Sequence, residues 1–193
     1  PIVYDYIMGN PPFVGMKYQS KKQKEDMSIV FEKVKGYGNL DYVASWYYKA
    51  CSYIKGNKTK CAFVSTNSIT QGEQVSNLWK NMFAKNIQID FAYRTFKWYS
   101  ESDDIARVHC VIIGFSCKDF SIATGTATLP SSRETSHKFI FDEKGNKNIA
   151  KHINGYLCDA DDVFIESRNK PLCNVLPMIA PNKPCDYNKL KIE

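Results

Sequence analysis

An amide, two prolines and an aromatic ring stand together near the start of the chain, in the order Asn10-Pro11-Pro12-Phe13. Each proline fixes its own φ and pushes the residue before it out of the helical region, so the backbone of Asn10 and Pro11 is held extended. Because Pro11 has no N–H, its carbonyl oxygen is an acceptor without a competing donor, and the Asn10 side chain offers a second acceptor. Two acceptors beside an aromatic face suit a planar ring that carries an NH2 group.

Adenine is such a ring, and its exocyclic amine is a poor nucleophile because the ring takes up the nitrogen lone pair. Hydrogen bonds from both amine hydrogens to this loop would favour a pyramidal amine, whose lone pair can attack a methyl donor. Phe13 would stack on the base. The alternative is a strand that ends in an ordinary Asx-Pro turn without chemistry.

The elements around this loop follow from the apolar pattern. The run Ile2–Ile7 is β-branched and aromatic and stops at Gly9, which predicts a buried strand that delivers the loop. A strand, a crossover helix and a strand imply parallel pairing, whereas the acidic segment 95–104 is too short for a crossover helix and predicts an antiparallel hairpin. The other expected elements are helices over 27–34, 40–54 and 71–83 and strands over 61–64, 87–93 and 108–115.

Ligands of open parallel sheets bind at the carboxyl ends of the strands. Thr66 and Asn67 follow the second strand and should lie at the same edge as Asn10, either as substrate contacts or, equally, as a hydrogen-bonded loop. Phe96 and Trp98 lie at the mouth of the expected hairpin and are candidates for a second stacking surface. Burial in the core is the slightly favoured alternative for each ring.

Charged residues flank the proline loop. Lys17, Lys21 and Lys22 are candidates for contacts to DNA phosphates, and a solvated helix start is the alternative. Asp41 falls in the expected first turn of the helix over 40–54, where a carboxylate complements the helix dipole. We therefore assign Asp41 a structural role.

The composition of the chain limits its class of protein, its partners and its cellular compartment. The 193 residues are 44% hydrophobic and 13% aromatic, which is enough for a core, and the formal charge of +6 permits a polyanionic partner. No apolar run approaches the roughly 18 residues of a membrane span, so no membrane partner is expected. The seven cysteines are odd in number and form no Cys-x-x-Cys, and the three histidines are scattered. These features predict reduced cytoplasmic thiols and no metal site.

Asp5-x-Ile7-x-Gly9 and the proline loop together resemble motif IV of the S-adenosylmethionine-dependent adenine-N6 DNA methyltransferases. Protein-glutamine and some ribosomal-RNA methyltransferases carry a similar loop. Longer blocks of sequence are more specific than the proline loop, and they resemble the MmeI-like class of DNA methyltransferases. These blocks are Asn39–Ala44, Trp46–Ala50, Ala62–Val75, Leu78-Trp79, Thr95–Trp98 and Val111–Phe115. A looser likeness to the lead-in of the target-recognition region of that class covers 153–157, 161–165, 167–172 and 184–186.

The resemblance implies an α/β chain with a partial class I methyltransferase (Rossmann-like) fold, in which parallel strands are closed by an antiparallel hairpin. Residues 1–118 would be the C-terminal half of the catalytic domain, from motif IV onward. Residues 119–193 would be a linker and the lead-in to the target-recognition region, an irregular C-terminal extension. Within it, the residue pattern of Lys138–Asp142 and Gly145-Asn146 suggests a short strand and a turn.

The resemblance also implies methyl transfer from S-adenosylmethionine to the exocyclic amine of an adenine flipped out of double-stranded DNA, as part of restriction–modification. Asn10 and Pro11 would orient the amine, Pro12 would stiffen the loop and Phe13 would stack. Such enzymes hold the cofactor with a glycine-rich turn upstream of motif IV, so we expect half of a cofactor site here and no activity of the chain alone.

Three further expectations stay open at this stage. The free edge of the first strand could pair with a second copy of the chain. The chain could be a DNA-binding fragment that transfers nothing. It could also belong to an RNA or protein methyltransferase that uses the same loop.

Overall fold

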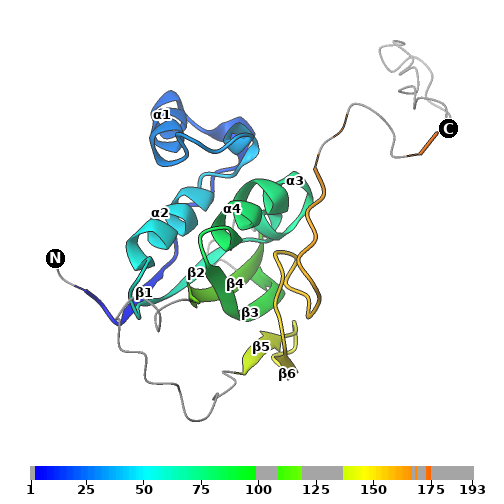
Figure 1. Cartoon of the computed structure of the whole chain (residues 1–193). Coiled ribbons are helices and arrows are strands. Elements are labelled where there is room, and N and C mark those ends of the chain that lie inside the picture. The colour runs from blue at the N-terminus through cyan, green and yellow to red at the C-terminus, as the bar shows by residue number, and fades with distance from the viewer. Residues whose placement is uncertain (1–2, 99–107, 119–136, 167, 169–172, 175–193) are drawn as a thin grey trace.

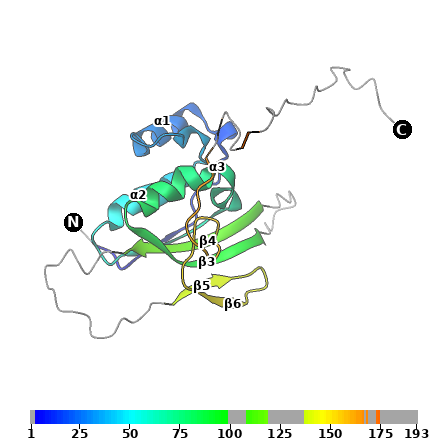
Figure 2. The same ribbon diagram turned by 45° about the vertical axis from the view of Figure 1, so that its right-hand side comes forward.

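Six strands form one mixed sheet, and the helices lie over one of its faces (Figure 1, Figure 2). The arrangement is that of a computed structural model, which describes residues 3–98, 108–118, 137–166, 168 and 173–174. The strands, in the sheet order β1-β2-β4-β3-β5-β6, are β1 (Tyr6–Gly9), β2 (Lys60–Thr66), β4 (Val108–Cys117), β3 (Ile87–Trp98), β5 (Lys138–Phe141) and β6 (Lys147–Ala150). The helices are α1 (Lys21–Val30), α2 (Ala44–Ile54), α3 (Gly72–Gln74) and α4 (Lys80–Phe83), with a π-helical turn at Val75–Trp79 and 3-10 turns at Met16–Tyr18, Tyr37–Asn39 and Asn67–Thr70.

The pairing of the first four strands confirms the expected fold class. β1 and β2 run parallel, joined by the crossover through α1 and α2. The prediction that the first strand is buried is wrong, because β1 is at one end of the sheet order and only Ile7 of its four residues is partly buried. β4 pairs antiparallel with both β2 and β3, so the hairpin of β3 and β4 closes the parallel pair. This is the pattern of the partial Rossmann-like fold that the sequence predicted. None of the helices in the described ranges is long and apolar enough to cross a membrane.

β3 is longer than the sequence indicated. The prediction that the third strand ends at Tyr93 is wrong, because Phe96, Lys97 and Trp98 pair with β4 as well. Irregularities between Ile89 and Phe91 and between Tyr93 and Phe96 shift the register. Such bulges interrupt the alternating pattern from which strand ends are predicted.

The helix layer buries one face of the sheet around Tyr47, in the middle of α2. Tyr47 is fully buried, and its ring lies 5.5 Å from the ring of Phe115 and 5.3 Å from that of Phe63. Its hydroxyl donates to the carbonyl oxygen of Phe63 (3.1 Å), which satisfies the buried polar group. The core between helices and sheet is therefore aromatic and closely packed.

The extension after β4 is partly regular. β5 pairs parallel with β3, and β6 pairs antiparallel with β5, so residues 138–150 continue the sheet. The expected short strand and turn are present, and β6 is an element that the sequence pattern did not predict. Farther on, Ile153 and Leu157 are buried against the core. These contacts join this part of the extension to the sheet and its helix layer.

Candidate functional site

The proline loop, Asn10-Pro11-Pro12-Phe13, leaves β1 at the carboxyl edge of the sheet. Gly9, the last residue of β1, lies opposite Phe63 of β2. Asn10 and Pro12 are exposed, Pro11 is buried, and Phe13 is partly buried against the core. Pro11 therefore anchors a loop on which the Asn10 side chain stays accessible to a ligand.

The strand register brings the predicted edge residues to the same side of the sheet. Thr66, the last residue of β2, lies opposite Cys110 of β4, and Cys110 lies opposite Phe96 of β3. β1 runs parallel to β2, so Asn10 leaves its strand at this edge too. The structure thus places Asn10 and Thr66 along one edge, where the sequence pattern also predicted Asn67, and it adds Phe96 to that edge.

The two candidate stacking residues are part of β3. The Phe96 ring is partly buried and lies 6.0 Å from the Tyr93 ring in an edge-to-face contact. The backbone of Trp98 lies opposite Val108 at the end of the hairpin. The sequence pattern placed both residues in the connection between two strands, whereas both belong to β3. Their stacking role stays a prediction.

Three polar side chains and one backbone N–H, that of Met16, tie the segment after the proline loop to the end of β2. We call this group the Asp41 cluster (Met16, Asp41, Thr66 and Ser68). The Met16 backbone N–H donates to Asp41 Oδ1 (3.2 Å), and the Ser68 hydroxyl donates to Asp41 Oδ2 (2.5 Å). Ser68 Oγ also lies 2.7 Å from Thr66 Oγ1. The cluster thus links residues that are distant in the sequence.

Asp41 is not in the first turn of a helix, as the sequence suggested, because α2 begins at Ala44. Its carboxylate accepts hydrogen bonds from the loop and from Ser68 instead. The hydroxyl-rich run that ends β2 was the available signal for such a network, but its partner could not be found by spacing. Asn67 lies in the 3-10 turn that follows, where its carbonyl oxygen accepts from the Thr70 hydroxyl (2.7 Å).

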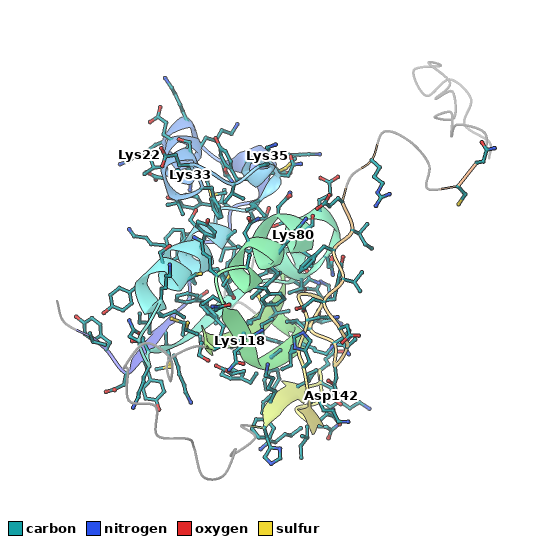
Figure 3. The ribbon with its side chains drawn as sticks, in the orientation of Figure 1. Lys22, Lys33, Lys35, Lys80, Lys118 and Asp142 are labelled. Carbon is teal, nitrogen blue, oxygen red and sulfur yellow. The ribbon has the colours of Figure 1, made fainter. Side chains whose placement is uncertain are left out.

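The candidate phosphate contacts lie just after the proline loop. Lys17 is in the turn Met16–Tyr18, and Lys21 and Lys22 form the first residues of α1; all three are exposed. Lys22 lies on the outer part of the molecule with α1 (Figure 3). The Ser20 side chain caps this helix by accepting from the backbone N–H of Gln23 (3.2 Å), so the helix start is well defined.

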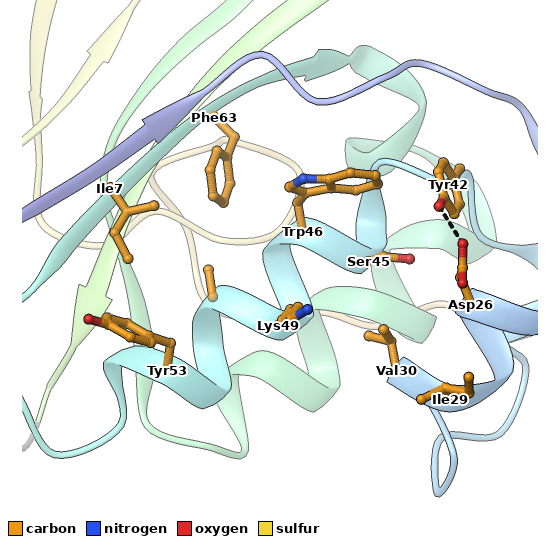
Figure 4. A pocket seen from close by; sticks show the side chains of 11 residues that line it. Ile7, Asp26, Ile29, Val30, Tyr42, Ser45, Trp46, Lys49, Tyr53 and Phe63 are labelled. Carbon is orange, nitrogen blue, oxygen red and sulfur yellow. Dashed lines mark hydrogen bonds between the residues drawn. The ribbon is translucent and has the colours of Figure 1, made fainter. Parts of the chain in front are cut away.

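A cavity of about 520 Å³ lies between β1 and the helices α1 and α2 (Figure 4). Ile7, Trp46 and Phe63 give it an apolar wall. At one end the Tyr42 hydroxyl donates to Asp26 (2.8 Å), and this hydrogen bond raises the pKa of Tyr42. The cavity offers apolar packing space and no arrangement of nucleophile and base.

A second cavity, of about 480 Å³, lies between strands on the opposite face of the sheet. Asp90 and Lys138 both line it. Burial raises the pKa of Asp90 and lowers that of Lys138, because each charged form loses solvation. One carboxylate oxygen of Asp90 has no hydrogen-bond partner among the described residues.

Three of the described thiols, those of Cys51, Cys61 and Cys110, are buried. Burial raises the pKa of Cys51 to about 11 and that of Cys61 to about 12, so neither is a thiolate at neutral pH. Within the described ranges, no group of three or more His, Cys, Asp or Glu side chains is arranged to hold a metal ion.

Comparison with known proteins gives three findings. The family model described as "MmeI, DNA-methyltransferase domain" matches residues 3–125. DNA methyltransferase A of Bacillus subtilis (strain 168) is 39% identical over 181 residues, which are 94% of this chain and 19% of that protein. A solved structure of the Type IIL restriction-modification enzyme MmeI in complex with DNA is 44% identical, with a TM-score of 0.76 over 88% of this chain and 22% of the other.

These findings confirm the resemblance that the sequence motifs indicated, and the structural match confirms the fold. The chain spans about a fifth of the length of each of these two relatives. Neither finding supports the expected self-association through β1.

Proposed function

Because this chain belongs to the MmeI family of DNA methyltransferases, we propose that the protein transfers a methyl group from S-adenosylmethionine to the exocyclic amine of an adenine in double-stranded DNA, within a restriction–modification system. The observation that carries the proposal is the exposed Asn10 on a loop that buried Pro11 anchors at the carboxyl edge of the sheet.

The loop acts on the amine through acceptors. The Asn10 side-chain oxygen and the Pro11 carbonyl oxygen accept one amine hydrogen each, which turns the nitrogen lone pair toward the methyl carbon. The nitrogen–carbon bond then forms as the carbon–sulfur bond breaks, and the amine loses one proton to solvent. No strong base is needed, because proton loss can follow transfer.

Aromatic side chains hold the base. Phe13 packs against the core on one side, so its remaining face is available for stacking. Phe96 and Trp98, at the same edge of the sheet, would supply a second surface. Stacking and hydrogen bonds offset the few kcal/mol that flipping a base out of the duplex costs.

Lys17, Lys21 and Lys22 contact the DNA backbone in this proposal. Two of them, Lys21 and Lys22, occupy the first turn of α1, where the helix dipole disfavours positive charge. Helix stability therefore does not explain their position, whereas a phosphate placed beside the helix start does. The DNA complex of the MmeI relative agrees with a DNA partner.

S-adenosylmethionine supplies an activated methyl group on a positively charged sulfur. The residues assigned above reach the methyl group and the base, and we assign no residue of this chain to the ribose or the methionine part. We therefore expect the 193-residue chain alone to bind the cofactor too weakly for calorimetric detection and to be inactive. Clear stoichiometric binding would contradict this expectation. A cytoplasmic location belongs to the same proposal, since free thiols fit a reducing compartment.

The test is product analysis with the full-length protein. DNA is incubated with methyl-labelled S-adenosylmethionine and digested to nucleosides, and we expect the label in the deoxynucleoside of N6-methyladenine. Label in the deoxynucleoside of N4-methylcytosine would contradict the choice of base. Label in RNA or protein, supplied in parallel reactions, would contradict the choice of substrate.

A further inference from the structure

The Asp41 carboxylate is the point at which three separate segments meet. It accepts from the Met16 N–H, four residues of chain after Pro12. It also accepts from Ser68, in the turn that follows β2. Asp41 itself is held before α2, because its backbone N–H donates to Gln74 Oε1 (3.2 Å) and the next N–H, that of Tyr42, donates to the carbonyl oxygen of Val14 (2.9 Å).

The direction of the hydrogen bonds in the cluster follows from the donor inventory. A carboxylate can only accept, so the single hydroxyl hydrogen of Ser68 points to Asp41. Ser68 Oγ can therefore meet Thr66 Oγ1 only as an acceptor, and the hydroxyl hydrogen of Thr66 points to Ser68. The Thr66 hydroxyl can therefore only accept a hydrogen bond from a ligand at the sheet edge.

We infer that Asp41 is a positioning residue for methyl transfer. It holds the segment after the proline loop at a fixed distance from β2, and through Ser68 it makes the Thr66 hydroxyl an obligate hydrogen-bond acceptor at the edge that Asn10 shares. Because Asn10 and Pro11 accept the two hydrogens of the adenine amine, Thr66 favours a further N–H or O–H donor of the bound substrates over an acceptor. This inference rests on the proposed function, which it deepens by assigning a residue outside the loop.

The Asp41→Asn variant separates the two roles of the carboxylate. Its amide oxygen has to face the Met16 N–H, because the amide NH2 at that position would meet another donor. The NH2 then donates to Ser68, so the Ser68 hydrogen turns to Thr66 and the Thr66 hydrogen turns toward the edge. The hydrogen bond that anchors the Met16 segment is kept, and the hydrogen bonds among residues 41, 68 and 66 reverse their direction. Asp41→Ala loses both.

Amide hydrogen exchange tests the anchor without any use of activity. We expect faster exchange over residues 10–18 in Asp41→Ala and exchange as in the wild type in Asp41→Asn, both in the full-length protein. Unchanged exchange in Asp41→Ala would overturn the anchoring role, whatever the protein methylates.

Steady-state methylation kinetics test this hydrogen-bond relay from Asp41 through Ser68 to Thr66. We expect Asp41→Asn to lower kcat about tenfold, the loss typical of one neutral hydrogen bond, with the KM values for DNA and cofactor nearly unchanged. Thr66→Val should show the same loss, and the double variant should lose no more than either single variant, because both changes remove one interaction. Asp41→Ala should lose on the order of 100-fold, since the loop is also displaced.

Asp26→Asn is the matched control, because Asp26 also accepts from a hydroxyl, that of Tyr42, but lies on α1 outside the cluster. We expect its kcat to match the wild type. Full activity of Asp41→Asn, or losses that multiply in the double variant, would overturn the relay. A wild-type protein that methylates no DNA would instead overturn the proposed function. The exchange experiment would still test whether Asp41 holds residues 10–18 in place.

Discussion

The carboxyl edge of the sheet and the extension after β4 are held to the same sheet by opposite means. At the edge, exposed or partly buried polar groups join distant segments, as Asp41 joins Met16 and Ser68. In the extension, buried apolar side chains such as Ile153 and Leu157 fill space against the core. The difference indicates that changes at the edge should alter activity more than stability, and that changes in the extension should do the reverse.

The largest effect is expected at the edge, for Asn10→Ala. Removal of one of two acceptors for the amine should lower kcat on the order of 100- to 1000-fold. The melting temperature should stay within about a degree of the wild type, because the Asn10 side chain is exposed. Methylation kinetics and thermal unfolding of the full-length protein measure the two. Asn148→Ala, an exposed asparagine of β6, is the control that should change neither, and equal turnover in Asn10→Ala would remove this residue from the mechanism.

The next effect is expected in the extension, for Gly155→Ala. A Cβ at this position would lie 2.8 Å from Val75 Cγ1 and 3.0 Å from Trp79 Cβ, so the buried segment has to move away from the helices. We expect a decrease of about 1 to 3 kcal/mol in the free energy of unfolding, measured with denaturant. Gly38→Ala, where the added Cβ meets nothing within 4 Å, should be close to neutral. If both variants unfold alike, the extension is not packed as described.

Lys21→Ala with Lys22→Ala should act on DNA affinity alone. Both residues are exposed, so the melting temperature should not fall. The slope of log affinity against log salt concentration should decrease by about 0.9 for each phosphate that the variant no longer neutralises. Lys144→Ala with Lys151→Ala, exposed lysines of the extension, should leave the slope unchanged, and the same decrease in both pairs would point to a general charge effect.

The smallest effects concern two aspartates with opposite pKa shifts. Burial raises the pKa of Asp90, so its ionisation opposes folding, and this destabilisation disappears as the pH falls below the ordinary Asp range. Hydrogen bonds from Asn146 lower the pKa of Asp142, so its carboxylate stabilises the fold at neutral pH and loses that effect in acid.

Asp90→Asn should therefore raise the melting temperature at neutral pH, and Asp142→Asn should lower it. The Asp90→Asn difference should shrink toward zero at about pH 3, below the ordinary Asp value, whereas the Asp142→Asn difference should disappear only below the lowered pKa of Asp142. Thermal unfolding at neutral pH and at these acid pH values measures them. Differences of the same sign at neutral pH would show that the surroundings of one carboxylate differ from those described.

Local features of the chain could be predicted because neighbouring residues dictate them. Two prolines fix the backbone around Asn10 whatever surrounds them, and the short acidic segment after β3 leaves a hairpin as the only connection. The parallel pair and the location of Thr66 at the edge followed from the same rules. β6 and the end of β3 did not, since pairing with β5 and bulges in register decide them.

The sequence by itself determined the proline loop, the strand that delivers it and the family to which the chain belongs, because these depend on residue types and spacing along the chain. Only the tertiary structure decided the role of Asp41. A carboxylate has no local rule that selects its partners, and Met16 and Ser68 reach it only after the crossover has folded over the sheet. Hydrogen-bond direction in the cluster, and with it the acceptor character of Thr66, is a property of that assembled geometry.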